Sequence, residues 1–322
     1  MSITKTQKSV LITGCSPGGI GHALCREFLS KGTSVTVSPL MREKGVKSWQ
    51  TGNGLGNSEW DEADGWLAGL HVIATARNKA TITDLEALGC WTVSLEVTNQ
   101  ESIEAAKKEV DGLTGGRLDI LVNNANCTMP ALDVSVDDAR ACFETNFFGV
   151  ISITQSFIPL LIASKGLILN IGSVAGIMPY AFGSVYNASK AALHAYSRTL
   201  RLELEPFDVR VMVVVTGGVQ SNIARGDRKL PEGSLYLPIK ADFERRVTHS
   251  QEGAMSNEVY ARGVVKEALK PKPIKWLWRG NKAFFVWFIR AWFGTWVFDR
   301  VMPRMFGLDK LKALVRAKAK NA

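Results

Sequence analysis

The chain has little cysteine and no N-terminal apolar segment long enough for a signal peptide, and each absence excludes some classes of protein. Its five cysteines among 322 residues lie at spacings that are not typical of metal ligands. We therefore expect no metal site and a reducing intracellular environment with inert thiols. The first apolar run covers only residues 10–12, far too few for a signal peptide. The cysteines are Cys15, Cys25, Cys90, Cys127 and Cys142.

Most of the chain also lacks net positive charge. The formal charge is +9, yet residues 271–322 contain twelve Lys or Arg and two Asp, so the preceding 270 residues sum to −1. A neutral body argues against nucleic acid as a partner and gives the basic tail a role of its own. The 46% hydrophobic content suits a packed core, and the length allows one large α/β domain or two small ones.

The N-terminal region has the pattern of a dinucleotide-binding unit. Residues 9–13 predict a buried strand, a glycine-rich turn occupies residues 14–21, and a helix is expected from about residue 20 to residue 30. The glycines allow the backbone to approach a pyrophosphate, and the N-terminus of the helix offers free N–H groups to it. The flanking strand and helix favour cofactor binding over an ordinary tight turn.

Two segments compete for the second strand, residues 34–38 and residues 71–77. We choose the later one because it ends in Arg77, whose side chain can pair with a 2′-phosphate. This choice leaves residues 33–70 as an aperiodic insertion in a compact unit, which is uncommon. We hypothesise that the segment is an unremoved intron or a gene-structure error. If it is authentic, we expect a disordered surface excursion near the adenosine pocket that lowers NADPH affinity.

The rest of the chain alternates strands and helices. This order predicts an α/β fold, a Rossmann-type doubly wound parallel sheet with helices on both faces. Ligands of such sheets bind outside the carboxyl ends of the strands, where Gly14, Arg77, Asn123, Ser173 and Thr216 are expected. The expected strands are residues 91–97, 118–123, 167–171 and 209–215, and the helices are residues 101–110, 137–163 (with a division near 148) and 185–205.

The C-terminal third is less regular. Residues 220–256 are polar with scattered Gly and Pro, and they are either a mobile flap over the site or a surface loop with a short helix. Residues 255–269 are expected to be helical. Residues 274–278 alternate in polarity and predict a last strand.

Tyr186 and Lys190 have a spacing that suits proton transfer. Four residues apart on a helix, they share a face, so the ammonium can favour the phenolate and lower the pKa of Tyr186. In the reduction of a ketone, Tyr186 would donate the proton and Ser173 would bond the oxygen that gains charge. Asn146 could hold a water that links Lys190 to solvent. Singly, each residue also has an ordinary structural role, and for Asn146 alone we favour a backbone-bonded amide.

With these residues in this order, the sequence resembles the short-chain dehydrogenase/reductase family over about residues 8–32 and 70–270. The resemblance implies a Rossmann-fold NAD(P)(H) oxidoreductase, with Arg77 implying NADP(H), and catalysis by Ser173, Tyr186 and Lys190 with Asn146. Pro17, Asn126 and Glu96 depart from the usual pattern without removing a catalytic group. The resemblance places the cofactor on Ile12, Gly14, Ser16, Gly19, Ile20, Gly21, Arg77, Glu96, Val97, Asn123, Asn124, Ala125, Tyr186, Lys190, Thr216 and Val219.

Four further segments are similar to the fungal NADPH-dependent 1-acyldihydroxyacetone-phosphate reductases: residues 130–133, 182–186, 206–211 and 216–219. That branch implies reduction of an acylated dihydroxyacetone phosphate at the endoplasmic reticulum or lipid droplets, with the cytosol as the other location. Two alternatives stay open, a reductase of a polyketide or terpenoid intermediate and an inactive membrane-held binding protein. The family also implies a homodimer or homotetramer. The pocket is expected to be lined by residues 126–133, 177–183 and 220–256.

Residues 281–322 form a tail rich in aromatic and basic residues. Five of the nine tryptophans lie between Trp276 and Trp296. Arg290 interrupts the apolar run, so no uncharged stretch reaches the ~18 residues of a spanning helix. Aromatic rings flanked by Lys and Arg suit the lipid headgroup region, so we expect a membrane-surface segment. The alternative is a helix packed on the core or on a dimer partner.

Overall fold

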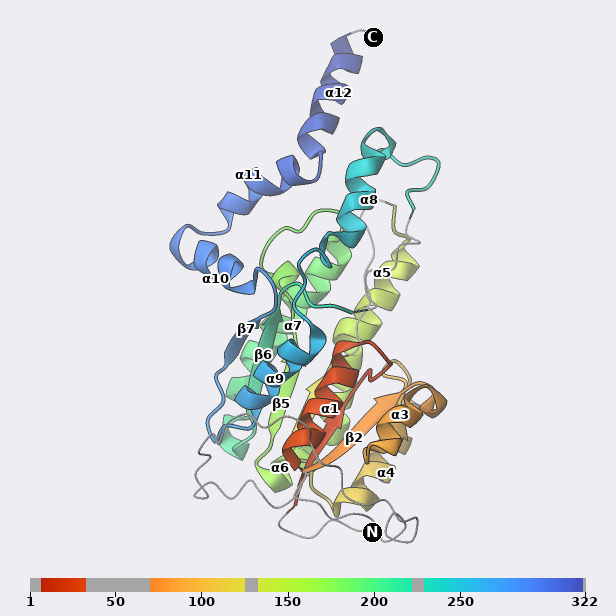
Figure 1. The fold of residues 1–322 in the computed structure, drawn as a ribbon, viewed down its shortest axis with the longest axis vertical. Helices are drawn as coiled ribbons and strands as arrows, with labels where there is room; N and C mark the ends of the chain where they lie inside the picture. The colour runs from red at the N-terminus through yellow and green to blue at the C-terminus, as the bar shows by residue number, and fades with distance from the viewer. Residues whose placement is uncertain (1–6, 33–69, 125–132, 222–228, 321–322) are drawn as a thin grey trace, which may run out of the picture.

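The computed structural model describes residues 7–32, 70–124, 133–221 and 229–320, and its centre is one parallel sheet (Figure 1). The seven strands run in the order β3-β2-β1-β4-β5-β6-β7, and every neighbouring pair is parallel. This order confirms the predicted doubly wound Rossmann-type fold. The strands are β1 (Lys8–Ile12), β2 (Leu70–Ala76), β3 (Trp91–Ser94), β4 (Ile120–Asn123), β5 (Leu167–Ile171), β6 (Arg210–Thr216) and β7 (Trp276–Arg279).

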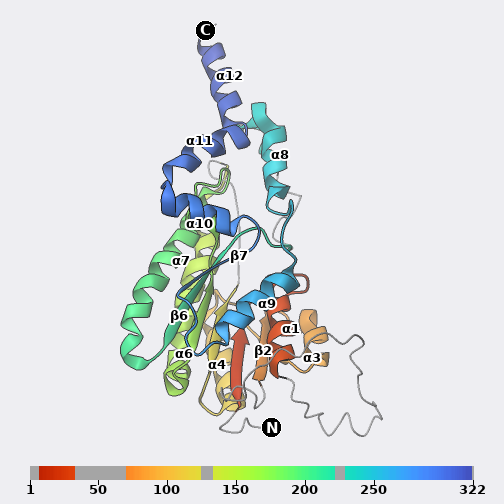
Figure 2. The ribbon, with the colours of Figure 1, turned by 60° about the vertical axis from the view of Figure 1, so that its left-hand side comes forward.

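Helices cover both faces of the sheet (Figure 2). On one face lie α1 (Ile20–Gly32), α3 (Thr83–Ala87) and α9 (Asn257–Ala268), and on the other lie α4 (Gln100–Thr114), α6 (Gly149–Ser164) and α7 (Ser184–Glu203). Each face has its own buried cluster, so Val10 and Ile12 of β1 pack on one side and Leu11 on the other. Burial on both faces explains why these strands are continuously apolar.

The insertion begins and ends at neighbouring points of the fold. Lys8 of β1 pairs with Leu70 of β2, so the later candidate for the second strand is confirmed. A Cβ built on Gly32 would lie 2.7 Å from the backbone nitrogen of Leu70. The last residue of α1 and the first of β2 are therefore in contact. The earlier candidate, residues 34–38, and the nature of the insertion lie outside the described residues.

Some element boundaries differ from the sequence prediction. The strand expected at residues 91–97 ends at Ser94, because its partner β2 ends at Ala76, which pairs with Ser94. The helix expected at residues 101–110 continues to Thr114 and begins after Asn99, whose side chain accepts a hydrogen bond from the Ser102 N–H at 2.8 Å. For residues 220–256, one of the two predictions is a surface loop with a short helix, and the structure has such a helix, α8 (Lys240–His249). Residues 222–228 lie outside the described part.

The predicted helix pair after β4 is one continuous helical stretch of three parts. A π-helical turn, η3 (Glu144–Phe148), joins α5 (Val136–Phe143) to α6. Within the described residues, Val136–Ser164 is the one helical stretch long and apolar enough to span a membrane. Its buried side chains, including Ile153 and Phe157, belong to the core cluster under the sheet, so we assign its apolar character to core packing.

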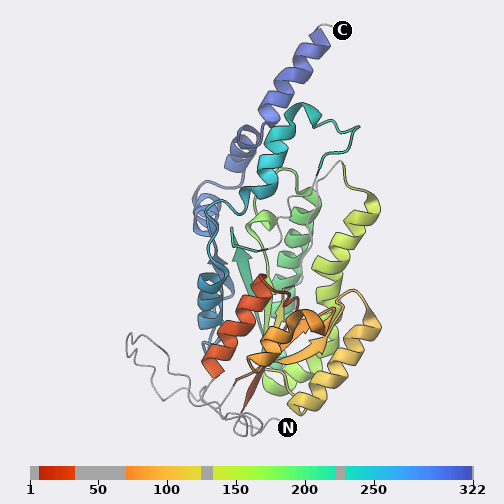
Figure 3. The same ribbon diagram turned by 45° about the vertical axis from the view of Figure 1, so that its right-hand side comes forward.

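Three helices follow the last strand. They are α10 (Ala283–Trp292), α11 (Trp296–Met305) and α12 (Leu308–Lys320). The first two pack through Val286, Ile289, Phe298 and Met302 against the loop after β5, in a third apolar cluster. The last helix extends away from the body beyond α8 (Figure 3), and none of its residues is buried. The predicted membrane-surface tail is thus a helical segment whose first half belongs to the packed body.

Candidate functional site

The glycine turn between β1 and α1 has the backbone that its sequence predicts. Gly14 and Gly18 have φ angles of 69° and 73°, in the left-handed region that favours glycine. The Gly19 N–H donates to the Ser16 carbonyl at 3.1 Å, which closes the turn before Ile20 starts the helix. The turn that Pro17 lengthens therefore keeps the geometry that a dinucleotide site needs.

A close approach between two chain segments fixes this turn to the sheet. The Asn124 amide donates to the carbonyls of Thr13 and Gly14 at 3.0 Å each. A Cβ at Gly21 would lie 2.5 Å from the Gly14 carbonyl oxygen, so this position has no room for a side chain. The turn, the helix start and the end of β4 thus form one rigid cradle that accommodates a pyrophosphate. Ala125 and Asn126, which follow in the sequence, lie outside the described residues.

Arg77 and Glu96 lie at the next two strand ends. The Arg77 side chain is 83% exposed, and its Nε is 3.7 Å from the Glu96 carboxylate. The other Glu96 oxygen accepts hydrogen bonds from the backbone N–H and the hydroxyl of Thr98. Glu96 thus holds its own loop in place and orients Arg77, whose guanidinium stays accessible at the position where the sequence predicts a 2′-phosphate.

Tyr186 and Lys190 share one face of α7, as their spacing predicts. The Lys190 Nζ lies 5.9 Å from the centre of the Tyr186 ring and donates to the Ile171 carbonyl at 3.0 Å. Lys190 is 2% exposed, and this burial lowers its pKa from 10.5 to about 8. The ammonium is therefore cationic at neutral pH but loses its proton far more readily than a surface lysine does.

Ser173, at the end of β5, is the third of the predicted catalytic residues beside Tyr186 and Lys190. Its Oγ accepts a hydrogen bond from the Ala175 N–H at 3.1 Å, so the hydroxyl proton remains available to a substrate oxygen. Its own backbone N–H donates to His194 Nε2 at 3.3 Å. The sequence analysis did not identify His194. Its position four residues after Lys190 on the same helix face was the signal that could have found it.

Asn146 lies in the π-helical turn, a feature frequent at functional sites. It is fully buried, and its Nδ2 donates to the Ser189 hydroxyl at 2.9 Å. Ser189 in turn donates to the Tyr186 carbonyl at 2.8 Å. The irregular turn therefore directs the Asn146 amide toward the helix that carries Tyr186 and Lys190.

Buried amides form a chain beneath the site. Asn123 donates to Asn170 at 2.9 Å, and Asn170 donates to the Ser197 hydroxyl at 2.9 Å. The Asn123 side-chain oxygen has no hydrogen-bond partner among the described residues although it is buried, and such a group favours a donor from a bound ligand. Sequence analysis identified Asn123 as a cofactor residue but not the chain beyond it.

The remaining predicted cofactor residues lie at the same sheet edge. The Ile12 carbonyl accepts from the Thr75 hydroxyl, and the Val97 carbonyl faces Gly149 at the start of α6. The Thr216 hydroxyl pairs with the Tyr260 hydroxyl at 2.6 Å, and Val219 forms a parallel bridge with Met255. The structure therefore brings these residues to the carboxyl ends of the strands.

A cavity of about 380 Å³ opens at this edge, with Ser173 and Tyr186 on its wall. Two of the predicted lining segments contribute to it, residues 177–183 and 220–256, whereas residues 126–132 lie outside the described part. Sequence analysis missed the wall formed by the C-terminal helices, whose inward residues recur at helical spacing. The residues of α10 and α11 that line the cavity are Phe285, Val286, Ile289, Val297, Phe298, Val301, Met302 and Met305.

The fold and the strand-end geometry define a Rossmann-type dinucleotide-binding protein with a tyrosine–lysine pair beside a cavity. The short chain dehydrogenase family model matches residues 63–231. The short-chain dehydrogenase srdE of Neurospora crassa is 39% identical over 312 residues, which cover 96% of this chain and 95% of that protein. The chain therefore belongs to the short-chain dehydrogenase/reductase family, whose members are oxidoreductases that bind a nicotinamide cofactor.

A further relative and a solved structure are also similar to the chain. The NADPH-dependent 1-acyldihydroxyacetone phosphate reductase of Schizosaccharomyces pombe is 36% identical over 244 residues, which cover 73% of this chain and 70% of that protein. The crystal structure of a short-chain dehydrogenase from Streptomyces avermitilis aligns with a TM-score of 0.68 over 96% of this chain and 98% of its own. At 24% identity, this second likeness supports the fold.

Proposed function

We propose that the protein is an NADPH-dependent carbonyl reductase that converts a ketone on a hydrophobic, lipid-like substrate to a secondary alcohol. The observation that carries the proposal is the composition of the cavity beside Tyr186. One wall holds Ser173 and Tyr186, and the facing helices α10 and α11 supply apolar side chains such as Ile289 and Met302. A polar reactive end and an apolar body of the substrate can therefore be held together.

The cofactor in this proposal is NADP(H). Gly14 and Gly21 provide the close backbone approach for the pyrophosphate at the N-terminus of α1. The exposed guanidinium of Arg77, oriented by Glu96, would pair with the 2′-phosphate. When bound, NADPH supplies the hydride for the carbonyl carbon. The reductase of Schizosaccharomyces pombe, which is NADPH-dependent by name, supports this assignment.

The residues of the chain would supply the proton and hold the oxygen. Tyr186 would donate its phenolic proton to the oxygen that gains charge, and Ser173 would donate a hydrogen bond to the same atom. The cationic Lys190, 5.9 Å from the Tyr186 ring, favours the phenolate that remains. Asn146 would hold a water that returns a proton to Lys190 from solvent, as its position against Ser189 suggests.

An acylated dihydroxyacetone phosphate, reduced to the acylglycerol phosphate, is our first candidate substrate. Its acyl chain would lie against α10 and α11, and its phosphate would lie near Lys282 and His249 on the cavity wall. A polyketide or terpenoid ketone is the second candidate. The Neurospora crassa relative, which matches over 96% of this chain, is named only as a short-chain dehydrogenase, so its name leaves this second candidate open.

The test is NADPH oxidation by the purified full chain with both classes of ketone. We expect turnover with a 1-acyldihydroxyacetone phosphate and none with unacylated dihydroxyacetone phosphate, because the latter has no group for the apolar wall. Higher kcat/KM with a bicyclic ketone such as trans-1-decalone would favour the second candidate. Tyr186→Phe is the control, and activity retained in that variant would contradict the mechanism. NADPH binding without turnover would support a binding protein instead.

We further propose that the protein works at a membrane surface, at the endoplasmic reticulum or lipid droplets. The outward face of the C-terminal helices is aromatic, with Phe284 69%, Trp292 72% and Trp296 55% exposed. Helix α12 adds basic residues, including Lys318 and Lys320 in its last turn. Aromatic rings beside cations suit the headgroup region of anionic lipid. Because the same helices line the cavity, a lipid-like substrate could enter from the bilayer.

A further inference from the structure

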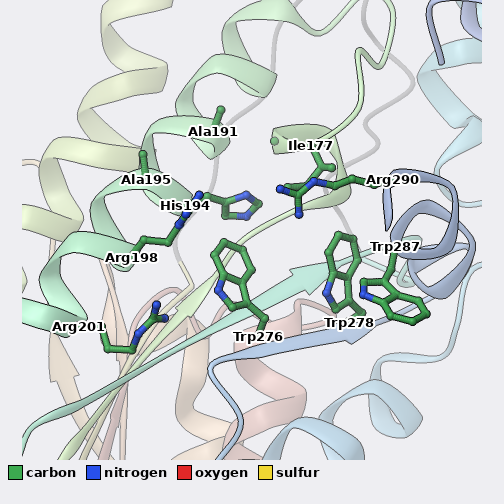
Figure 4. A pocket seen from close by; sticks show the side chains of 11 residues that line it. Ile177, Ala191, His194, Ala195, Arg198, Arg201, Trp276, Trp278, Trp287 and Arg290 are labelled. Carbon is green, nitrogen blue, oxygen red and sulfur yellow. The ribbon is translucent and has the colours of Figure 1, made fainter. Parts of the chain in front are cut away.

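A second cavity, of about 590 Å³, lies on the α7 side of the sheet (Figure 4). Helix α7, strand β7 and helix α10 line it, together with the turn after Ser173. No described residue lines both cavities. The proposed reaction therefore makes no use of this space.

Three arginines give the second cavity a strong positive charge. Arg198 and Arg201 come from α7 and Arg290 comes from α10, and no acidic residue is among the residues that line the space. None of the three takes part in an ion pair within the described residues. One guanidinium nitrogen of Arg201 is buried without a hydrogen-bond partner. Arg198 and Arg290 are exposed to solvent, and three cations that line one cavity without a counter-charge favour an anion.

His194 adds an unsatisfied donor to the same wall. The residue is 4% exposed, and its Nε2 accepts from the Ser173 N–H, so a neutral ring carries its proton on Nδ1. Burial and the nearby charges of Lys190 and Arg290 lower the pKa of His194 to about 3, which keeps the ring neutral. Its Nδ1 is buried without a partner. A buried donor of this kind is costly unless a ligand supplies an acceptor.

Three indole rings give the cavity an apolar side. Trp276 and Trp278 alternate along β7 and point to the same face of the sheet, and Trp287 comes from α10. In Figure 4 the three rings lie below His194 and the guanidinium group of Arg290, and Arg201 lies beside Trp276. The His194 ring meets Trp276 edge to face at 5.3 Å. A ligand here would have its charged group among the arginines and its apolar part against the indoles.

We propose that this second cavity is a binding site for an amphipathic anion. Arg198, Arg201 and Arg290 would hold a carboxylate or phosphate group, and the Trp276 and Trp278 rings would cover an apolar body. This site is separate from the catalytic cavity, and the turn after Ser173 lies between the two. Neither the proposed ketone nor its cofactor is needed for binding here.

Isothermal titration calorimetry on the full chain tests the proposal. The probes are decanoate, decyl phosphate, inorganic phosphate and 1-decanol, each below its micelle-forming concentration. We expect decanoate or decyl phosphate to bind at least 10-fold more tightly than inorganic phosphate or 1-decanol, because only they offer both the charge and the apolar body. The stronger of the two identifies the carboxylate or the phosphate as the preferred group.

Variants assign the binding to this cavity. Arg201→Gln and Arg290→Gln are each expected to weaken binding by about 10- to 100-fold, the loss of one charge-assisted hydrogen bond. Arg300→Gln is the matched control, since Arg300 lies over Trp296 and lines neither cavity. Ala195→Trp fills the space without removing a charge and should also abolish binding. Unchanged affinity in all three cavity variants, or equal affinity for 1-decanol, would overturn the proposal.

Discussion

The charge of Lys190 controls the reactivity of this site at the scale of single residues. In the free protein its pKa is lowered to about 8 by burial, so the ammonium is present below pH 8 and lost above it. We expect kcat/KM for ketone reduction to fall above about pH 8, approaching tenfold per pH unit, because the cation that favours the Tyr186 phenolate disappears. The measurement is the pH profile of kcat/KM at an NADPH concentration well below saturation. Under this condition the free protein is sampled.

Lys190→Arg is the informative comparison for this profile. A guanidinium stays charged throughout the accessible pH range. The residual activity of this variant should therefore show no decline near pH 8. A decline that persists in the variant would assign the titration to Tyr186 and contradict our interpretation.

A substitution of Arg77 tests the preference for NADPH over NADH, again at the scale of a single residue. Its guanidinium is held by Glu96 at 3.7 Å yet remains 83% exposed at the end of β2. Replacing it in Arg77→Gln removes the cation that would meet the 2′-phosphate, so KM for NADPH should rise about 10- to 100-fold. KM for NADH should change little, since NADH lacks that phosphate. Equal effects on both cofactors would show that Arg77 has a structural role instead, and Arg140→Gln, on the surface of α5, is the control.

At the scale of elements, the insertion does not separate the helix and the strand that flank it. Gly32 at the end of α1 and Leu70 at the start of β2 are in contact. A variant that lacks residues 34–68 would keep two linker residues, a usual length for this connection. We expect it to fold with an unchanged far-UV circular dichroism spectrum and a melting temperature within a few degrees of the full chain. If the insertion weakens cofactor binding, the variant should also bind NADPH more tightly.

The C-terminal helices form the wall of the catalytic cavity and should therefore select the substrate. Ile289 of α10 is 9% exposed and lines the cavity. Ile289→Ala removes apolar contact with a long substrate, so KM for a long-chain ketone should rise about tenfold while kcat for a short ketone stays within a factor of two. Ile162→Ala, at an exposed position on α6, is the matched control. Equal losses with short and long ketones would contradict this role.

At the scale of the whole molecule, the aromatic residues of the tail are divided between two faces. The inward residues complete the body, while Phe284, Trp292 and Phe293 are more than half exposed. We expect the full chain to float with liposomes that contain anionic lipid and to do so less in high salt. Replacing these three residues by serine should abolish flotation without loss of fold, because they lie outside the packed cluster.

A matched triple variant controls for the loss of exposed apolar area. Leu202, Phe207 and Leu235 are exposed to a similar degree but lie outside the C-terminal helices. Replacing them by serine should leave flotation unchanged. If both triple variants float as the parent does, the tail is not the membrane-binding surface.

Sequence alone determined the framework and the candidate chemistry of this protein. Continuous apolar strands separated by helices can only be buried on both faces of a parallel sheet, which brings Gly14, Ser173 and Thr216 to one edge. The spacing of Tyr186 and Lys190 needs only a regular helix to place them together. These predictions depend on local periodicity and on the geometry that all such sheets share.

Tertiary structure alone decided what surrounds that chemistry. The extent of β3 depends on where its partner β2 ends, and the burial that lowers the pKa of Lys190 depends on the packing of α7 against β5. An aromatic and basic tail is compatible with a free membrane anchor or with a packed wall. Its division between the catalytic cavity, the arginine-lined cavity and an exposed face follows from contacts between segments far apart in the sequence. Local patterns cannot specify such contacts, because they depend on how whole elements pack.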